Sequence, residues 1–374
     1  MEKTIKRIFV STVMLMAVVS GWAQGLTATL QQGTTMRTYY GVDAFKEAYA
    51  AASSGAVITL SAGTFNTVEE ITKSITLIGN GAIGDKQTYL YTASKTSDGY
   101  YPNLIINANN VRIEGLRLNA SDAILIRKVS NLKISHCYIN CLRATLQHTN
   151  TIIDQCFISK EYAINQGVNY CLKNCFIDEP YQEGSTSNLT YITNCLIYKY
   201  YYYHRISDKN YYKIVYPYAI YKNCILGYHS YNSSNLSNTS SDYSKGYYIW
   251  SPGTKTQSEY YNNVFYYYPS DYDDGFLKFN DFLETLELKS VPTGTNRTGN
   301  MKSTYNDLFT SMSYYLPGFI KTDLKGDDGK QVGPYGGSGF SLIPSIPRIT
   351  SSTIDSYTNA EGKINVKIKV ENNQ

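Results

Sequence analysis

The sequence predicts an all-β protein, a right-handed parallel β-helix with a short N-terminal capping helix. Three observations predict this fold. Nine-residue segments recur with a period near twenty, their inward columns are apolar, and asparagine recurs at two fixed positions. A repeat of this length is typical of solenoids, in which each coil stacks on its neighbours because it cannot bury a core alone.

The first 23 residues are expected to be a signal peptide. A basic stretch ending at Arg7 precedes an apolar run over residues 8–19, and small residues stand just before Gln24. Such a run is too short to cross a bilayer as a helix. We therefore expect export to the periplasm, the cell surface or the extracellular space, with no transmembrane segment. The β-helix is expected over residues 24–336.

Residues 43–52 are predicted to form the capping helix, with Asp43 as its N-cap. Such a helix would close the first coil, whose edge is otherwise unpaired. Strand segments follow at 55–65 and 71–81, each ending in turn residues. The apolar residues of the helix fall on one face, at Ala44, Phe45, Ala48 and Tyr49.

The repeat defines two short strands in each coil. Columns two and four of the repeat share one parity, and columns seven and nine share the other. If all these residues face inward, the chain must turn a corner between the two pairs of columns. Seven segments carry the repeat, at 110–118, 131–139, 150–158, 169–177, 189–197, 218–226 and 257–265.

Asparagine marks the bends of the predicted coil. Asn tolerates the left-handed backbone conformation, and its amide can bond the amide stacked one coil away. Both asparagine columns are therefore predicted to be corners with stacked amides. The sixth column contains His136, Gln155, Asn174, Asn194, Asn223 and Asn262, and the first column contains Asn110, Asn131, Asn150 and Asn169.

Five of the seven cysteines occupy the inward seventh column, at Cys137, Cys156, Cys175, Cys195 and Cys224. Thiols stacked in register form a line rather than a tetrahedron, so no metal site is predicted there. The sequence leaves open whether some of these cysteines form disulfides. The coil spacing suits a disulfide, but five thiols cannot all pair. Since free Cys is commonly buried, we interpret the column as a structural thiol ladder.

Charge and composition narrow the class of partner. The 34 basic and 30 acidic residues give a net charge of +4 and are spread along the chain, which disfavours nucleic acid. The 38 tyrosines are far above ordinary usage. A tyrosine joins an apolar ring to a polar hydroxyl, so it suits wet binding faces and strand surfaces alike.

Insertions at 178–188, 198–217 and 228–258 all follow the ninth column, so they are expected to emerge from one side and build a binding face. The loop 86–102 is expected to extend that face. The alternative is that the tyrosines of this face only cover loops and exposed strand surfaces.

Aromatic rings stack on sugar rings, so these insertions are candidates for carbohydrate binding. The candidate carbohydrate-binding residues are Tyr200, Tyr202, His204, Arg205, Tyr211, Lys213, Tyr247 and Trp250.

The segments DAFKEAYAAASSGAVITLSAGTFN (43–66) and SITLIGNG (74–81), with the repeated coils, resemble secreted pectin-lyase-like β-helix proteins of Gram-negative gut bacteria. The ending GKQVGPYGGSGF (329–340) is similar to the C-terminal end of many of them. The resemblance implies the fold but no single chemistry, because that superfamily mixes lyases, hydrolases, epimerases and adhesins. Of the polygalacturonase motifs only Asp273-Asp274 is present, and a pectate-lyase calcium set is missing.

The tail over residues 337–374 is predicted to be separate from the β-helix. Pro344 and Pro347 precede an alternating strand that includes Ile368 and Val370. That strand either caps the solenoid or pairs with a partner at the surface.

The leading hypothesis is an exported or surface β-helix that binds complex carbohydrate through its tyrosine-rich flank, with no identifiable active site. One alternative is a polysaccharide lyase or glycoside hydrolase acting on uronate-containing glycans, with His204 and Lys213 among the bases and Glu183 among the acids. The other alternative is a structural or adhesive protein. No cofactor is expected, and calcium belongs only to the lyase alternative.

Overall fold

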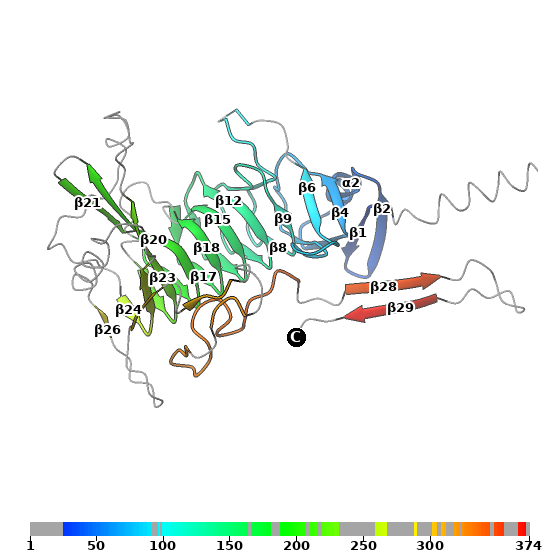
Figure 1. The fold of residues 1–374 in the computed structure, drawn as a ribbon. Helices are drawn as coiled ribbons and strands as arrows, with labels where there is room; N and C mark the ends of the chain where they lie inside the picture. Colours follow the sequence, from blue (N-terminus) through cyan, green and yellow to red (C-terminus); the bar gives the residue numbers. More distant parts are fainter. Residues whose placement is uncertain are drawn as a thin grey trace, which may run out of the picture.

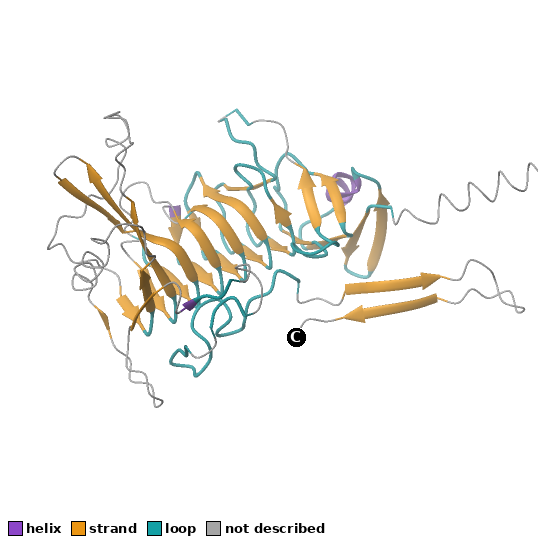
Figure 2. Ribbon diagram, viewed as in Figure 1, coloured by secondary structure: helices purple, strands orange, loops and turns teal. Residues whose placement is uncertain are grey.

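The chain folds as a right-handed parallel β-helix, as the repeat predicts (Figures 1 and 2). Two long sheets form its walls, and each coil contributes a strand to both. The computed structural model describes residues 25–91, 96–97, 99–163, 166–180, 188–206, 209–214, 219–231, 259–267, 288–289, 301–304, 308–311, 318–321, 324–344, 348–354 and 366–371.

Sheet A has 12 strands in the described part of the chain, and all its neighbours are parallel except β2–β1 and β1–β3. In spatial order they are β2 (Thr35–Tyr40), β1 (Thr27–Gln32), β3 (Ala56–Leu60), β5 (Ile75–Ile78), β8 (Arg112–Glu114), β11 (Lys133–Ser135), β14 (Ile152–Asp154), β17 (Tyr170–Lys173), β19 (Thr190–Thr193), β22 (Ala219–Lys222), β24 (Glu259–Tyr261) and β26 (Leu288–Lys289).

Sheet B has 13 described strands. Its main path is β27 (Met301–Thr304), β25 (Val264–Tyr267), β23 (Ile225–Tyr231), β20 (Leu196–Ile206), β18 (Phe176–Pro180), β15 (Phe157–Tyr162), β12 (Tyr138–Ala144), β9 (Arg117–Leu118), β6 (Thr88–Tyr91) and β4 (Gly63–Asn66). Off this path lie β7 (Leu104–Ile106), β10 (Ile124–Ile126) and β21 (Lys209–Ile214). A short ladder joins β13 (His148–Thr149) to β16 (Gly167–Val168).

Helix α2 (Ala44–Ala51) covers the first coil as predicted, and its expected apolar face is buried. Asp43 occupies the N-cap position as predicted, but its side chain makes no capping hydrogen bond. Asn66 Nδ2 instead donates to Asp43 Oδ1 at 2.9 Å. At the other end, Lys73 Nζ donates to the carbonyl oxygens of Tyr49 and Ala52, both at 2.8 Å, which satisfies groups that a helix C-terminus leaves unpaired.

The inward columns form one continuous core. The fourth column stacks in register, so that Ile134 pairs with Ile113 on one side and Ile153 on the other, and all three are fully buried. The five thiols of the seventh column are also fully buried, and all seven cysteines are free. Cys175 Sγ donates to the carbonyl oxygen of Lys173 at 3.0 Å, so the buried S–H group keeps a partner.

Both asparagine columns are corners, because every one of their residues has a positive φ between 48° and 57°. In the first column the amides stack as predicted: Asn131 Nδ2 donates to Asn110 Oδ1 at 3.0 Å, and Asn169 Nδ2 donates to Asn150 Oδ1 at 3.0 Å. The predicted stacking is wrong for Asn174 and Asn223 of the sixth column, whose amides bind a distant segment of the chain instead.

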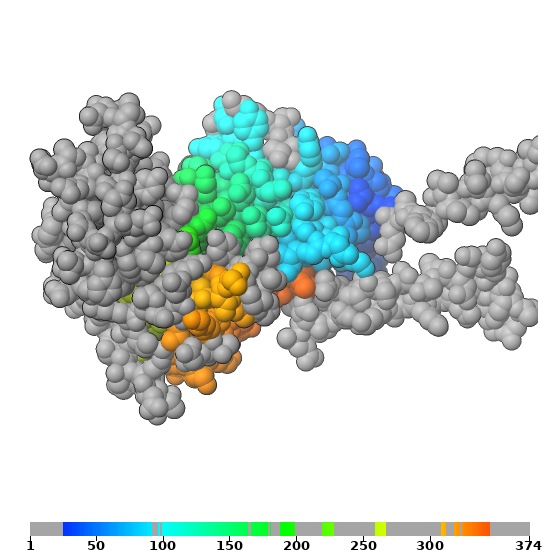
Figure 3. Space-filling model, in the orientation of Figure 1, coloured from blue at the N-terminus to red at the C-terminus, as the bar shows by residue number. Residues whose placement is uncertain are grey.

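That distant segment, residues 324–344, is called the returning segment here. It runs back along the solenoid from the last coils toward the first and packs against its surface, where it appears in orange in Figure 3. Because its partners lie on successive coils, it ties several of them together. Successive hydrogen bonds join Gly333 to Asn223, Pro334 to Asn174, Ser341 to His136 and Leu342 to Ala82.

The predicted C-terminal strand is present as β29 (Val366–Glu371). It pairs antiparallel with β28 (Arg348–Ile354), and the two form a separate two-stranded sheet. Figure 1 shows this hairpin at the N-terminal end of the solenoid. It follows the returning segment in the sequence. Within the described residues the strand therefore has an intramolecular partner.

Candidate functional site

The predicted binding residues fall on an extension of sheet B. Strand β20 continues past the ninth column and turns into β21, and β23 lies along its other edge. Figure 1 shows this hairpin projecting from the solenoid wall. For Tyr200, Tyr202, His204, Arg205, Tyr211 and Lys213 the structure describes the backbone alone, and Tyr247 and Trp250 lie outside the described residues.

The backbone register divides this predicted set between two faces of the hairpin. Tyr202 lies opposite Lys213, and His204 lies opposite Tyr211. Because directly opposite residues share a face of a sheet, these four positions belong together. Arg205 has the other parity and belongs to the opposite face. The assignment of these residues to a carbohydrate site stays a prediction.

A second candidate surface lies on the same sheet within the repeat itself, along the eighth column. This column faces outward, since its parity is opposite to that of the buried seventh and ninth columns. It nevertheless contains aromatic and aliphatic residues in an unbroken register across the sheet. From β6 to β25 it comprises Tyr89, Arg117, Tyr138, Phe157, Phe176, Leu196, Ile225 and Val264.

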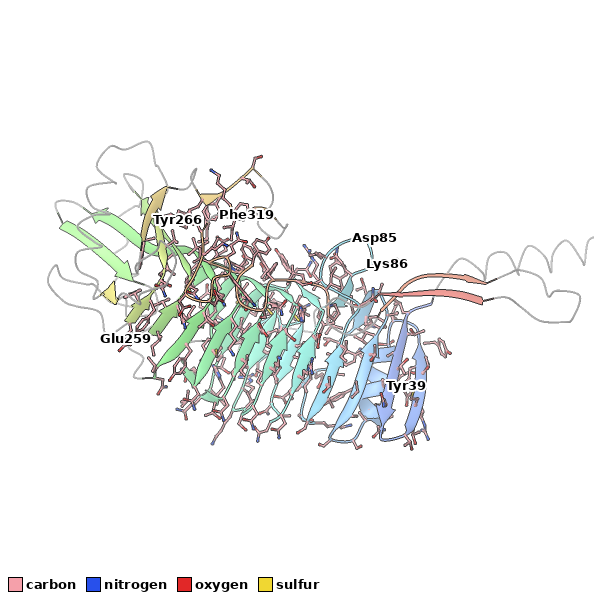
Figure 4. The ribbon with its side chains drawn as sticks, turned by 90° about the horizontal axis from the view of Figure 1, so that it is seen from below. Tyr39, Asp85, Lys86, Glu259, Tyr266 and Phe319 are labelled. Atoms are coloured by element: carbon pink, nitrogen blue, oxygen red, sulfur yellow. The ribbon has the colours of Figure 1, made fainter. Side chains whose placement is uncertain are left out.

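The C-terminal half of this column is covered by the chain itself. Phe176, Leu196, Ile225 and Val264 are at most 2% exposed, because a second hydrophobic cluster packs over them. Its covering residues include Phe309, Phe319, Ile320, Val332 and Phe340. Figure 4 shows Phe319 beside Tyr266 on this outer side of the solenoid, with Glu259 on the opposite side.

The N-terminal half of the column stays partly open and forms the first aromatic row: Tyr89, Arg117, Tyr138 and Phe157. The rings of Tyr138 and Phe157 stack at 4.9 Å with an interplanar angle of 9°. The Arg117 guanidinium carbon lies 4.2 Å from the Tyr138 ring centroid and 5.9 Å from that of Tyr89. The cation therefore lies over the Tyr138 ring, within the range of a cation–π interaction.

The guanidinium group of Arg117 makes few hydrogen bonds among the described residues. Its Nη1 donates to the carbonyl oxygen of Ala82 at 3.4 Å, and its buried Nε has no hydrogen-bond partner. Among the described residues no carboxylate lies within ion-pair distance of it. An arginine in this state presents donors in a fixed planar geometry that matches a carboxylate or another planar anion.

A second aromatic row consists of Tyr100, Arg143 and Tyr162, of which Arg143 and Tyr162 pair in the later parts of β12 and β15. The Arg143 guanidinium carbon lies 4.1 Å from the Tyr162 ring centroid and 5.3 Å from that of Tyr100. Here the charge is balanced, because Arg143 Nε lies 3.4 Å from Asp122 Oδ1. The two rows thus differ in one respect that matters for binding: only the second has an acidic partner within the described part of the chain.

The thiol nearest the second row is Cys141, which is 1% exposed. Burial raises the pKa of Cys141 to about 11, and the nearby Arg143 charge does not offset this. A thiol with that pKa is protonated at neutral pH, so it is not a nucleophile. Cys141 therefore supplies no thiolate nucleophile next to the second row at neutral pH.

At its C-terminal limit the first row ends in a partly open apolar hollow. The hollow is lined by Phe157, Phe176, Ile177, Asp178, Leu196 and Tyr198. Leu196 and Tyr198 belong to β20, the strand that continues into the projecting hairpin. The first row, the hollow and the predicted hairpin site consequently follow one another along sheet B.

Within the described ranges, no group of three His, Cys, Asp or Glu side chains is placed to hold a metal ion. No helix in that part of the chain is long and apolar enough to cross a membrane.

No protein-family model and no curated protein matches the chain. A pectin methylesterase in complex with hexasaccharide VII is a similar solved structure, 17% identical, covering 63% of this chain and 90% of that chain with a TM-score of 0.35. Pectin methylesterase PemA from Erwinia chrysanthemi is 15% identical, covering 49% of this chain and 73% of that chain with a TM-score of 0.30. Likeness at this level transfers neither activity nor substrate to this chain.

Sequence reasoning included Tyr89 and Tyr100 through the loop 86–102 but missed Arg117, Tyr138, Phe157, Arg143 and Tyr162. A signal for the first row was present in the repeat. An outward column that holds Arg, Tyr, Phe and Phe on consecutive coils departs from the polar residues usual at such positions. The second row had no comparable signal, because Arg143 and Tyr162 lie beyond the aligned nine residues.

Proposed function

We propose that this chain is an exported β-helix protein that binds an extended anionic carbohydrate along the outer face of sheet B. The single observation that carries the proposal is Arg117, which lies over the Tyr138 ring and has no carboxylate partner among the described residues. An acidic sugar would supply the missing anion, and the neighbouring rings would stack on its apolar faces.

The shape of the surface supports an extended ligand. The first row spans four coils in register, from β6 to β15, at the strand spacing of about 4.8 Å. Such a row offers a series of similar contacts along the solenoid axis rather than one deep pocket. The hairpin of β20 and β21, with its predicted residues Tyr202, His204, Tyr211 and Lys213, would continue the contacts at one end.

The test measures binding of matched acidic and neutral oligosaccharides to the mature chain by calorimetry. Under the proposal the acidic ligands bind and Arg117→Gln weakens them about 10- to 100-fold, the usual size of a lost hydrogen bond to a charged group. Lys133→Gln is the control, since it removes the same charge from the outer side of sheet A. Equal losses in both variants, or no binding of any acidic glycan, would exclude the proposal.

The enzymatic alternatives stay predictions. The side chains of His204 and Lys213 are not described, and Glu183 lies outside the described residues. Product analysis on any glycan that binds would separate binding from cleavage. Both a lyase and a hydrolase leave a new reducing end, and only the lyase also leaves an unsaturated sugar.

A further inference from the structure

Strand β2 forms the outermost edge of sheet A, at the N-terminal end of the solenoid (Figure 1). One of its edges pairs with β1, and no described strand pairs with the other. Five of its six residues are exposed. Two of these are large and apolar, namely Met36, which is 66% exposed, and Tyr40, which is 72% exposed. A long exposed edge with apolar side chains is a template for pairing with another strand.

The hydrogen-bond pattern identifies which backbone groups of β2 have no partner among the described strands. Gly41 N donates to Leu26 O at 2.8 Å, so Leu26 and Gly41 form a hydrogen-bonded pair of the antiparallel ladder. Such pairs alternate along the ladder, so the odd-numbered residues of β2 bond to β1. The N–H and C=O groups of Met36, Thr38 and Tyr40 therefore point to the open edge.

These backbone groups are arranged for pairing with a second copy of the same strand. When two β2 strands run antiparallel with Thr38 opposite Thr38, Met36 of each copy faces Tyr40 of the other. All three residues then lie at hydrogen-bonded positions. On the other face of the sheet, Arg37 of each copy faces Tyr39 of the other. A thioether against an aromatic ring and a cation against an aromatic ring are both favourable cross-strand pairs.

Charge argues for this register over one of its two neighbours. Shifting the copies by one step so that Met36 faces Thr38 also keeps the hydrogen-bonding parity. That shift places Arg37 directly opposite Arg37 of the second copy, and like charges directly opposite are destabilising. The centred register avoids this repulsion and pairs every residue from Met36 to Tyr40.

We infer that the protein forms a two-fold symmetric homodimer in which two β2 strands pair edge to edge and join the two A sheets into one. The contact is self-complementary, as a two-fold interface requires. The inference is independent of the proposed carbohydrate site, which lies on sheet B. Figure 4 shows Tyr39 at the end of the solenoid, where a second copy would meet it.

The first experiment measures molecular mass by sedimentation of the mature chain over a concentration series, for wild type and Thr38→Pro. Proline at position 38 removes an N–H that points to the open edge and leaves the β1–β2 ladder intact. We expect a concentration-dependent dimer for wild type and for the Thr38→Ala control, and a monomer for Thr38→Pro with an unchanged circular dichroism spectrum. A wild-type monomer at every concentration, or a dimer that survives Thr38→Pro, would overturn the inference.

A second experiment tests the register. Thr38→Cys should form an intermolecular disulfide on mild oxidation, because directly opposite hydrogen-bonded residues have Cα atoms about 5.5 Å apart. Thr35→Cys is the control, since the two copies of residue 35 would be about 20 Å apart in this register. Crosslinking of Thr35→Cys as readily as Thr38→Cys would overturn the centred register.

Discussion

The side-chain amide of Asn174 donates a hydrogen bond to the carbonyl oxygen of Pro334 at 2.9 Å, across 160 residues of sequence. Asn174 is 3% exposed, and Ser338 Oγ donates back to its Oδ1 at 3.0 Å. Asn150, a first-column corner on the preceding coil, is exposed, and among the described residues its side chain bonds to the amides of Asn131 and Asn169 on the adjacent coils. Asn174 thus connects its coil to the returning segment, whereas Asn150 connects adjacent coils.

Replacing these two asparagines by alanine should separate the two roles. Both have left-handed backbones, with φ of 48° at Asn174 and 52° at Asn150, so both alanine variants carry the same backbone cost of about 1–2 kcal/mol. Asn174→Ala also leaves buried carbonyl groups without a donor, which adds about 1–3 kcal/mol. Urea unfolding should therefore show the larger loss for Asn174→Ala. Equal losses would mean that the returning segment is not held through Asn174.

The sequence predicted the corners because the left-handed conformation selects for asparagine locally. It could not predict what Asn174 binds, because the returning segment has no repeat and its contacts depend on how 160 residues of chain fold back. Prediction succeeded where local backbone preference and coil periodicity decide the structure. It failed for Asn174 and Asn223, where the partner comes from outside the repeat.

In the candidate site, too, the repeat predicts local geometry but not tertiary contacts. The parity of the repeat was enough to place Arg117, Tyr138 and Phe157 on one outward column. Parity does not tell which half of that column is covered. The returning segment and its neighbours bury Phe176 and leave Phe157 partly open, and only the tertiary structure shows that difference.

Tyr138 should contribute to ligand binding through its ring rather than its hydroxyl. Under the carbohydrate proposal, Tyr138→Phe keeps the stack on Arg117 and Phe157 and should bind acidic oligosaccharide within about threefold of wild type. Tyr138→Ala removes the stacking ring and should weaken binding about 10-fold. Calorimetry at two salt concentrations checks this result. A larger loss for Tyr138→Phe than for Tyr138→Ala would contradict the role of the ring.

Asp327 should hold the returning segment more firmly at neutral than at acid pH. Burial raises the pKa of Asp327, but hydrogen bonds from Lys222 and Asn223 outweigh this, so its pKa lies below the ordinary value. Lys222 Nζ is 2.7 Å from its carboxylate. A lowered pKa stabilises the folded state above about pH 4, and this contribution is lost as the pH falls through the folded value.

The measurement for Asp327 is the exchange protection of the Gly333 amide, which donates to Asn223 O at 2.8 Å. Asp327→Asn should lower this protection at pH 7, and the difference from wild type should shrink near pH 3. Asp328→Asn removes the same charge at an exposed neighbour and keeps the acceptor for Lys330 N, so it should leave the protection unchanged. The same effect in both variants would assign it to net charge.

The buried thiols should make the fold sensitive to alkali. Burial raises the pKa of Cys141 and of Cys171 to about 11, and it raises the pKa values of Cys156 and Cys195 in the same direction. A thiol whose pKa is higher in the folded chain stabilises the fold fully below about pH 8.5. That contribution is lost as the pH rises toward the folded value. Raising the pKa of Cys141 to about 11 corresponds to about 3 kcal/mol.

Urea midpoints in the presence of a reductant should therefore fall between pH 8.5 and 11. Tyrosines and lysines also titrate in this range, so the wild-type curve alone does not assign the effect. Cys141→Ala isolates one thiol: its midpoint should fall less steeply than that of wild type, because alanine has no proton to lose. Parallel curves for the two proteins would show that Cys141 ionises as readily in the folded chain as in the unfolded one. Its burial would then be without electrostatic consequence.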